Sequence, residues 1–218
     1  MLIAEDYLLL TMKDDGTSWV TSRELGVAGA LLGELAAQER VMLDEKGRLV
    51  VLDPGSTGDE VLDDFLGRLG DRAGKKPKDV LTAVSKGMAR ALLERLARAE
   101  IIREDRRNVL GMRLWSVWPF VDTSHRDQVR AGLLGVLLRR QEPDVRTGTL
   151  VSLLQATSAW GTALPKETRA GLKGSEIRSR AKEITKGRWG SEAVAKVITD
   201  MNAAVTAAVL VSGASGGD

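Results

Sequence analysis

Residues 148–165, GTLVSLLQATSAWGTALP, constrain the fold of this chain more than any other stretch. No charged side chain lies between Arg146 and Lys166, and the apolar residues face all sides when wound at 3.6 residues per turn. A helix without a polar face belongs inside a protein. The stretch is shorter than the roughly 20 apolar residues of a membrane span, and Ser, Thr and Gln interrupt it. It therefore predicts a buried central helix.

The rest of the sequence supplies segments that can cover such a helix. Apolar residues recur at helical spacing in five further regions, which are 21–40, 59–69, 78–102, 122–140 and 191–211. Two β-rich segments with turn signals lie between them, one over 40–53 and one that begins at Ile101 and ends at Trp118. We predict a mainly α, single globular domain over residues 1–211, with amphipathic helices around the central helix and two short β-hairpins, followed by a disordered tail over 212–218.

Three glycines, Gly26, Gly29 and Gly33, fall on or near one face of the region 21–40. Glycine in the middle of a helix costs stability unless it serves packing, so these positions predict the close approach of a neighbouring helix. A phosphate-binding loop is not indicated, because no strand precedes the glycines and the required pattern is not met.

Composition argues against most enzyme classes. The chain has no cysteine, which excludes disulfides and thiol catalysis, and a single histidine, His125. His125 follows a predicted helix cap and is interpreted as a capping or surface group rather than a general base. Neighbouring acidic residues point apart, and no metal-ligand spacing is present. We therefore predict no enzymatic activity, no cofactor and no metal. The N-terminus lacks a basic region and does not resemble a signal peptide, which predicts a cytoplasmic protein.

Charge is distributed unevenly along the chain. Residues 1–71 carry fifteen Asp or Glu against six Lys or Arg, whereas residues 72–113 carry twelve Lys or Arg against five Asp or Glu. A mobile basic linker is predicted over 70–77. In the helical region 78–102, cations recur at near-helical intervals on the face opposite the apolar stripe: Lys86, Arg90, Arg95 and Arg98. This pattern predicts a basic surface for phosphate or an anionic membrane, and the alternative is an incidental bias of solvated helix faces.

Two classes of binding protein fit these features. A cluster of cations with a nearby Trp suits a membrane surface. A helix followed by a hairpin, which occurs twice, also describes a winged-helix nucleic-acid module. Against the second class, the region 21–40 has only Arg23 and Arg40 as cations, and the more basic unit lacks the Asn, Gln and Ser common among base readers. No nucleic-acid partner is expected.

Several segments resemble the Golgi phosphoprotein 3 family, whose actinobacterial relatives share the length of this chain. They are the opening IAEDYLLLTMKDDGTSW, the helix and hairpin of GVAGALLGELAAQERVML, the segment ARALLERLARAEIIRED with its second hairpin ending in WP, and the central TLVSLLQATSA. Together they span nearly the whole chain up to about residue 210. Their order and spacing carry the resemblance.

The resemblance implies a mainly helical domain without enzymatic activity. Eukaryotic members bind phosphatidylinositol 4-phosphate at the Golgi membrane through one Trp and several Arg, and they help to retain glycosyltransferases. The Trp corresponds to Trp19 here, and one arginine position is Lys86. The other two arginine positions are Ala28 and Ala89, with Arg90 beside the latter. Alanine cannot replace the bidentate phosphate recognition of a guanidinium, so the pocket is only partly kept.

These observations lead to one main prediction. We expect a peripheral membrane protein of the cytoplasm, associated with the inner face of the membrane, that binds phosphatidylinositol 4-phosphate or another anionic headgroup through Trp19, Lys86 and Arg90. The family's second hairpin serves self-association, so the resemblance also implies a homo-oligomer through 101–118, together with protein clients. The alternative is a cytosolic protein-interaction module that has lost the lipid site, and a winged-helix-like nucleic-acid binder comes third.

Overall fold

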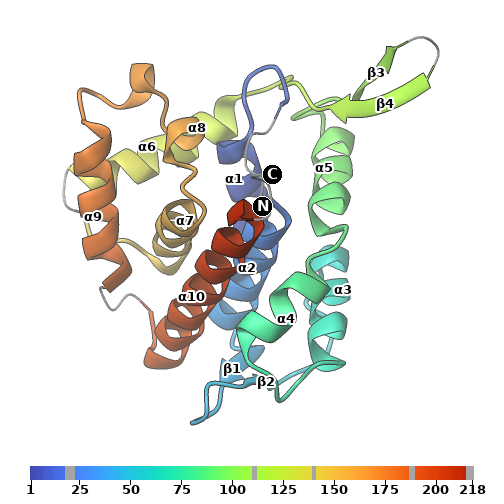
Figure 1. Ribbon diagram of the computed structural model, residues 1–218, viewed down its shortest axis with the longest axis vertical. Coiled ribbons are helices and arrows are strands. Elements are labelled where there is room, and N and C mark those ends of the chain that lie inside the picture. Colours follow the sequence, from blue (N-terminus) through green and yellow to red (C-terminus); the bar gives the residue numbers. More distant parts are fainter. Residues whose placement is uncertain (18–22, 110–111, 139–140, 187–189, 215–218) are drawn as a thin grey trace.

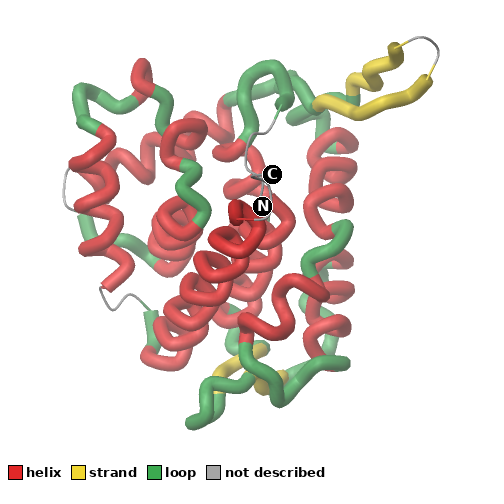
Figure 2. Tube along the Cα trace, in the orientation of Figure 1, coloured by secondary structure: helices red, strands yellow, loops and turns green. Residues whose placement is uncertain are grey.

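Helices form most of the chain in the computed structural model, which describes residues 1–17, 23–109, 112–138, 141–186 and 190–214 (Figures 1 and 2). In chain order the described helices are α1 (Ile3–Thr11), α2 (Arg23–Ala37), α3 (Glu60–Gly70), α4 (Pro77–Val84), α5 (Met88–Arg98), α6 (Ser124–Leu138), α7 (Val145–Ala156), α8 (Trp160–Ala163), α9 (Gly174–Lys186) and α10 (Glu192–Ala214). Strands β1 (Val41–Leu43) and β2 (Leu49–Val51) form one antiparallel hairpin, and β3 (Asp105–Val109) and β4 (Met112–Val117) form the other. The predicted mainly helical single domain with two hairpins is confirmed.

Two helices occupy the buried centre. Helix α7 is buried on all sides from Gly148 to Leu154, as predicted, and it packs against α1, α2, α9 and α10. Every residue of α1 is also buried, including Glu5 and Asp6. Helix α1 packs against α2, α5, α6, α7 and α8. The sequence predicts one central helix, and the structure contains this second one at the N-terminus.

The central helix is shorter than the apolar stretch 148–165. Helix α7 ends at Ala156, and Ser158 takes a left-handed φ of 54°. The Ala159 N–H donates to the Leu154 carbonyl at 3.0 Å, a bond that closes the last turn of a helix when the preceding residue is left-handed. The chain then continues as the short helix α8. Apolar composition therefore marks the buried segment correctly, while this turn divides it in two.

The glycines of α2 allow close helix packing, as predicted. A Cβ atom added at each of Gly26, Gly29 and Gly33 would come within 3 Å of a side chain from a neighbouring helix. The nearest atoms are Tyr7 Cζ at 2.2 Å, Leu153 Cδ2 at 2.7 Å and Thr149 Cγ2 at 2.8 Å, respectively. Helices α1 and α7 thus pack directly on the backbone of α2.

The segment after α3 is held in place, contrary to the predicted mobile linker over 70–77. The Gly74 N–H donates to the Leu49 carbonyl, and the Leu49 N–H donates to the Lys75 carbonyl, both at 2.8 Å. These bonds attach the segment to β2, which pairs with β1 through Val41↔Val51 and Leu43↔Leu49. A glycine-rich and lysine-rich composition suggests mobility, but the free edge of a hairpin offers unpaired backbone groups that can order such a segment.

The β3–β4 hairpin projects from the helical body at the end of α5 (Figure 2). Its register runs from Asp105↔Val117 to Val109↔Met112, with an irregularity between Arg107 and Asn108. The isolated bridge Ile102↔Phe120 continues the pairing at its base. The hairpin therefore has a paired base and projects away from the helical body.

Helix α10 closes the fold and reaches Ala214. Residues 212–214, which the sequence assigns to the tail, thus continue the helix, and 215–218 lie outside the described residues. By length and composition alone, Glu192–Leu210 could also span a membrane. One stripe of α10 is buried against α2, α4 and α7, as in a core helix, and it contains Val194, Val197, Ile198, Met201 and Val205.

Candidate functional site

Lys86 and Arg90 lie where α4 turns into α5. Gly87 makes this turn with a φ of 83°, a conformation that glycine adopts without steric cost. The side chains of Lys86 and Arg90 are exposed. The Lys86 carbonyl accepts a hydrogen bond from Arg68 Nη1 at 2.8 Å, which attaches the turn to α3. Trp19, the third predicted site residue, lies outside the described residues.

The start of α2 contacts the start of α5 through an acidic side chain. Glu24 lies in the first turn of α2, and its Oε2 accepts the Ala89 N–H at 3.2 Å. This carboxylate satisfies a backbone donor at the positive end of α5, where an anionic ligand would otherwise be favoured. Glu24 is a residue of this region that the sequence analysis did not single out. Its place in the first turn before the GVAG segment was the only available signal.

The two arginine positions that carry alanine are part of the core. Ala28 and Ala89 are fully buried, at 0% exposure. Their methyl groups therefore contribute to the packing between helices and offer nothing to a charged ligand. Of the cations that the resemblance implies, the described structure retains Lys86 and the neighbouring Arg90.

Arg90 faces an open groove between α5 and the base of the β3–β4 hairpin. The volume of this groove is about 510 Å³, and its other lining residues are Glu94, Ala97, Arg98, Glu104, Arg106 and Trp118. Arg90 Nε donates to Glu94 Oε1 at 2.7 Å, and the two side chains are 63% and 49% exposed. Lys86 does not line the groove. Lys86 and Arg90 are therefore close in sequence but do not belong to the same cavity.

The predicted basic face of α5 is largely neutralised. Arg95 turns inward and donates to Glu5 Oε1 at 2.9 Å and to Asp59 Oδ2 at 2.6 Å. Burial opposes the charge of Arg95, but both carboxylates outweigh this effect and raise the pKa of the guanidinium. Arg98 contacts Glu60 at 3.4 Å. The prediction that Arg95 belongs to one outward basic surface with Lys86, Arg90 and Arg98 is therefore wrong, whereas Arg98 is exposed and lines the same groove as Arg90. The acidic residues of α1 and α3 pair with the arginines of α5.

A second buried carboxylate joins distant parts of the chain. The Asp6 side chain has 0% exposure and lies 2.6 Å from Arg146 Nη2 and 2.7 Å from His125 Nε2. His125 is thus part of a hydrogen-bonded network around a buried carboxylate, where the sequence suggested a cap or surface group. Across the residues that the structure describes, no group of three or more His, Cys, Asp or Glu is arranged to hold a metal ion.

Comparison with known proteins assigns the sequence to a family. The family model for Golgi phosphoprotein 3 (GPP34) matches residues 3–201. A search of the curated proteins finds no match. The matched region begins in α1 and ends within α10, and it includes both hairpins and the α4–α5 turn. Most of the sequence is covered, and this chain therefore belongs to the Golgi phosphoprotein 3 (GPP34) family.

Proposed function

We propose that this protein is a non-enzymatic adaptor of the cytoplasm that binds phosphatidylinositol 4-phosphate, or a similar anionic headgroup, at the inner face of a membrane. The family generally binds phosphatidylinositol 4-phosphate at Golgi membranes. The observation that carries the proposal is the exposed Lys86 side chain at the α4–α5 turn, which has no carboxylate partner in the described part of the chain. Protein clients would be recruited from the same membrane.

The chemistry of this turn suits a phosphate group in two ways. The ammonium of Lys86 acts as a point charge that can approach phosphate oxygens from several directions. The pair between Arg90 and Glu94 is solvent-exposed, and such pairs contribute at most about 1 kcal/mol, so a phosphate can replace the carboxylate. We assign Trp19 the role of an interfacial anchor, because an indole ring combines an apolar body with a polar N–H.

Vesicle binding tests the proposal. We expect the protein to co-sediment with vesicles containing phosphatidylinositol 4-phosphate in preference to vesicles of equal charge without it. The triple variant Trp19→Ala, Lys86→Ala, Arg90→Ala is expected to bind about 30-fold more weakly, since each of its two lost cations contributes about 1 kcal/mol near an anionic surface. The control carries Arg178→Ala and Lys182→Ala, two exposed cations of α9. Equal binding by the wild type and the triple variant would reject this site.

Specific observations also favour the alternative, a cytosolic protein-interaction module that has lost the lipid site. Glu24 places a carboxylate at the start of α5, and Ala28 and Ala89 are buried where the family carries arginine. A carboxylate repels phosphate, and alanine supplies no hydrogen bond. If the wild-type protein binds none of the vesicles at low salt, this alternative replaces the lipid proposal.

We further propose that the β3–β4 hairpin mediates a homo-oligomer through residues 101–118. A two-stranded sheet that projects from the body has free edges, and free edges pair readily with another chain. Replacing residues 105–117 with a short Gly-Ser linker is expected to yield a monomer in light scattering, with an unchanged helical circular dichroism spectrum. A Gly-Ser replacement of residues 44–48 in the β1–β2 turn serves as the control. An oligomer that survives removal of β3 and β4 would contradict the proposal.

A further inference from the structure

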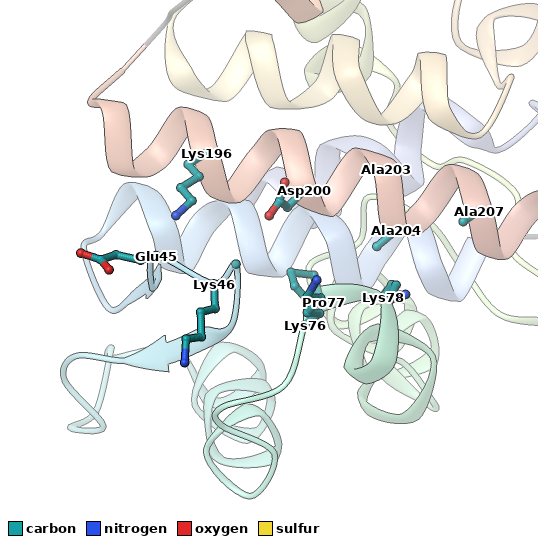
Figure 3. Close-up of a pocket in the computed structure, with 11 residues that line it drawn as sticks. Glu45, Lys46, Lys76, Pro77, Lys78, Lys196, Asp200, Ala203, Ala204 and Ala207 are labelled. Atoms are coloured by element: carbon teal, nitrogen blue, oxygen red, sulfur yellow. The ribbon is translucent and has the colours of Figure 1, made fainter.

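A second cavity, of about 490 Å³, lies between α10, the turn of the β1–β2 hairpin and the start of α4 (Figure 3). Lysines from all three segments line it: Lys46, Lys76, Lys78 and Lys196. The hairpin follows the C-terminal end of α2, whereas Glu24 contacts the start of α5 from the first turn of α2. The cavity is therefore separate from the Lys86 and Arg90 region.

Backbone hydrogen bonds and a lysine contact fix the walls of this cavity. The bond from the Gly74 N–H to the Leu49 carbonyl and the bond from the Leu49 N–H to the Lys75 carbonyl hold the segment that leads into α4 against the hairpin. On the other side, Lys196 Nζ donates to the Asp44 carbonyl at 2.5 Å, which links α10 to the hairpin turn. Three segments that are far apart in sequence are thus held together around one space, and the Lys196 ammonium group is fixed at its edge.

The start of α4 faces this space with a free backbone donor, although its first turn also carries the carboxylate of Asp79. Pro77 occupies the first helical position and has no N–H, and Lys76 provides no side-chain cap. Among the described residues, the Lys78 N–H has no hydrogen-bond acceptor, while the Asp79 N–H donates to the Lys76 carbonyl at 2.9 Å. The first turn of a helix carries partial positive charge. Here that charge adds to the ammonium groups of Lys76 and Lys78, both of which are exposed.

We propose that this cavity binds a phosphate ester with a short apolar group. Four lysines outnumber the two acidic residues of the lining, Glu45 and Asp200, so the cavity has an excess of positive charge. Ammonium groups and the start of a helix are the usual donors to phosphate oxygens. Asp200 points from α10 into the cavity, where it can accept a hydrogen bond from a ligand hydroxyl (Figure 3).

The α10 side of the cavity provides the apolar part of the site. Ala203, Ala204 and Ala207 form this wall, and Ala204 is buried while the other two are exposed. Methyl groups cannot bind phosphate but can cover a hydrocarbon group, which gains from leaving water. A phospholipid and a soluble phosphate ester both combine a phosphate with an apolar group, and binding to vesicles distinguishes the two.

Calorimetric titration of the full chain with hexyl phosphate tests the charged side of the site. We expect saturable binding, weaker binding of inorganic phosphate, and none of hexanol. The double variant Lys76→Ala, Lys78→Ala is expected to lose at least about tenfold in affinity, because each removed group is a charged hydrogen-bond donor. The matched control, Lys166→Ala with Lys182→Ala, removes the same charge from exposed positions outside the cavity and should bind normally. Failure of the wild type to bind hexyl phosphate overturns the proposal, as does equal affinity of the Lys76, Lys78 variant.

Filling the apolar side provides an independent test. Ala207→Phe places a ring in the cavity from an exposed position of α10, so the fold is expected to persist and hexyl phosphate binding to be lost. Thr206→Phe is the control, because Thr206 is exposed on the same helix but does not line this cavity. Unchanged binding by the Ala207→Phe variant would place the ligand elsewhere and overturn the proposal.

Binding to vesicles shows whether the ligand is a phospholipid or a soluble phosphate ester. Binding to phosphatidic acid vesicles that depends on Lys76 and Lys78 supports a phospholipid, and binding of hexyl phosphate without such vesicle binding supports a soluble ester. A variant with Lys86→Ala and Arg90→Ala is expected to keep its affinity for hexyl phosphate. Loss of affinity in that variant would overturn the assignment to this cavity, so the outcome is separate from that of the proposed headgroup site.

Discussion

Replacing Asp6 with Ala is expected to lower the free energy of unfolding by about 3 kcal/mol, because it removes the buried carboxylate that Arg146 and His125 both contact. The Asp6 carboxylate has 0% exposure and holds both Arg146 and His125. This value is at the lower end of the usual cost of breaking a buried ion pair, since the Arg146 side chain is 37% exposed and water can replace part of the lost interaction. Urea denaturation followed by circular dichroism measures the change.

The control for this variant is an ion pair at the surface. Glu60→Ala removes the partner of Arg98, in a pair whose side chains are 75% and 69% exposed. Exposed pairs contribute at most about 1 kcal/mol, so Glu60→Ala should cost far less than Asp6→Ala. If the two variants lose equal stability, burial is not what makes the Asp6 network important.

The second large effect is expected for Gly26→Ala, which should destabilise the fold by about 3 kcal/mol through overpacking. The added methyl group would lie 2.2 Å from Cζ and Oη of Tyr7, whose ring is completely buried. The ring cannot move without displacing other core residues. Gly67→Ala is the control, because Gly67 lies in α3 with no atom within 4 Å of an added Cβ. That change should stabilise the protein by up to about 1 kcal/mol through helix propensity.

A double-mutant cycle isolates the contact responsible. In a Tyr7→Leu background the ring is gone, and Gly26→Ala should cost at least about 1 kcal/mol less than it does in the wild type. The same urea measurement on four proteins gives this difference. An identical cost in both backgrounds would show that the close approach of Tyr7 to Gly26 is not the cause of the destabilisation.

Periodicity was sufficient to predict much of the fold. The apolar stretch that contains α7, the turn signals of both hairpins and the glycine face of α2 all depend on local spacing, which a single sequence displays directly. The acidic residues Glu5 and Asp6 were not recognised as buried. Their partners Arg95, His125 and Arg146 lie 90 to 140 positions further along the chain. Such pairing depends on tertiary contacts, which periodicity does not report.

In the candidate site, too, features that depend on local spacing were predicted, and contacts between distant segments were not. The helical spacing over residues 78–102 correctly places Lys86 and Arg90 at the surface. It also suggests an outward Arg95, because a helical wheel shows which residues share a face and not what lies opposite. In the folded chain Glu5 and Asp59 lie opposite Arg95 and draw it inward. The contact of Glu24 with the start of α5 also joins segments 65 residues apart.

The long reach of the Asp6 contacts has a consequence for biosynthesis. Helix α1 leaves the ribosome before the other elements of this domain, yet its buried carboxylate meets Arg146 only after 140 further residues have been made. Until α7 emerges, an apolar helix with an unpaired acid remains exposed, and such surfaces promote aggregation. Chains that stop before Arg146 therefore cannot reach the native state. The buried contacts of α1 can therefore be completed only late in the synthesis of the domain.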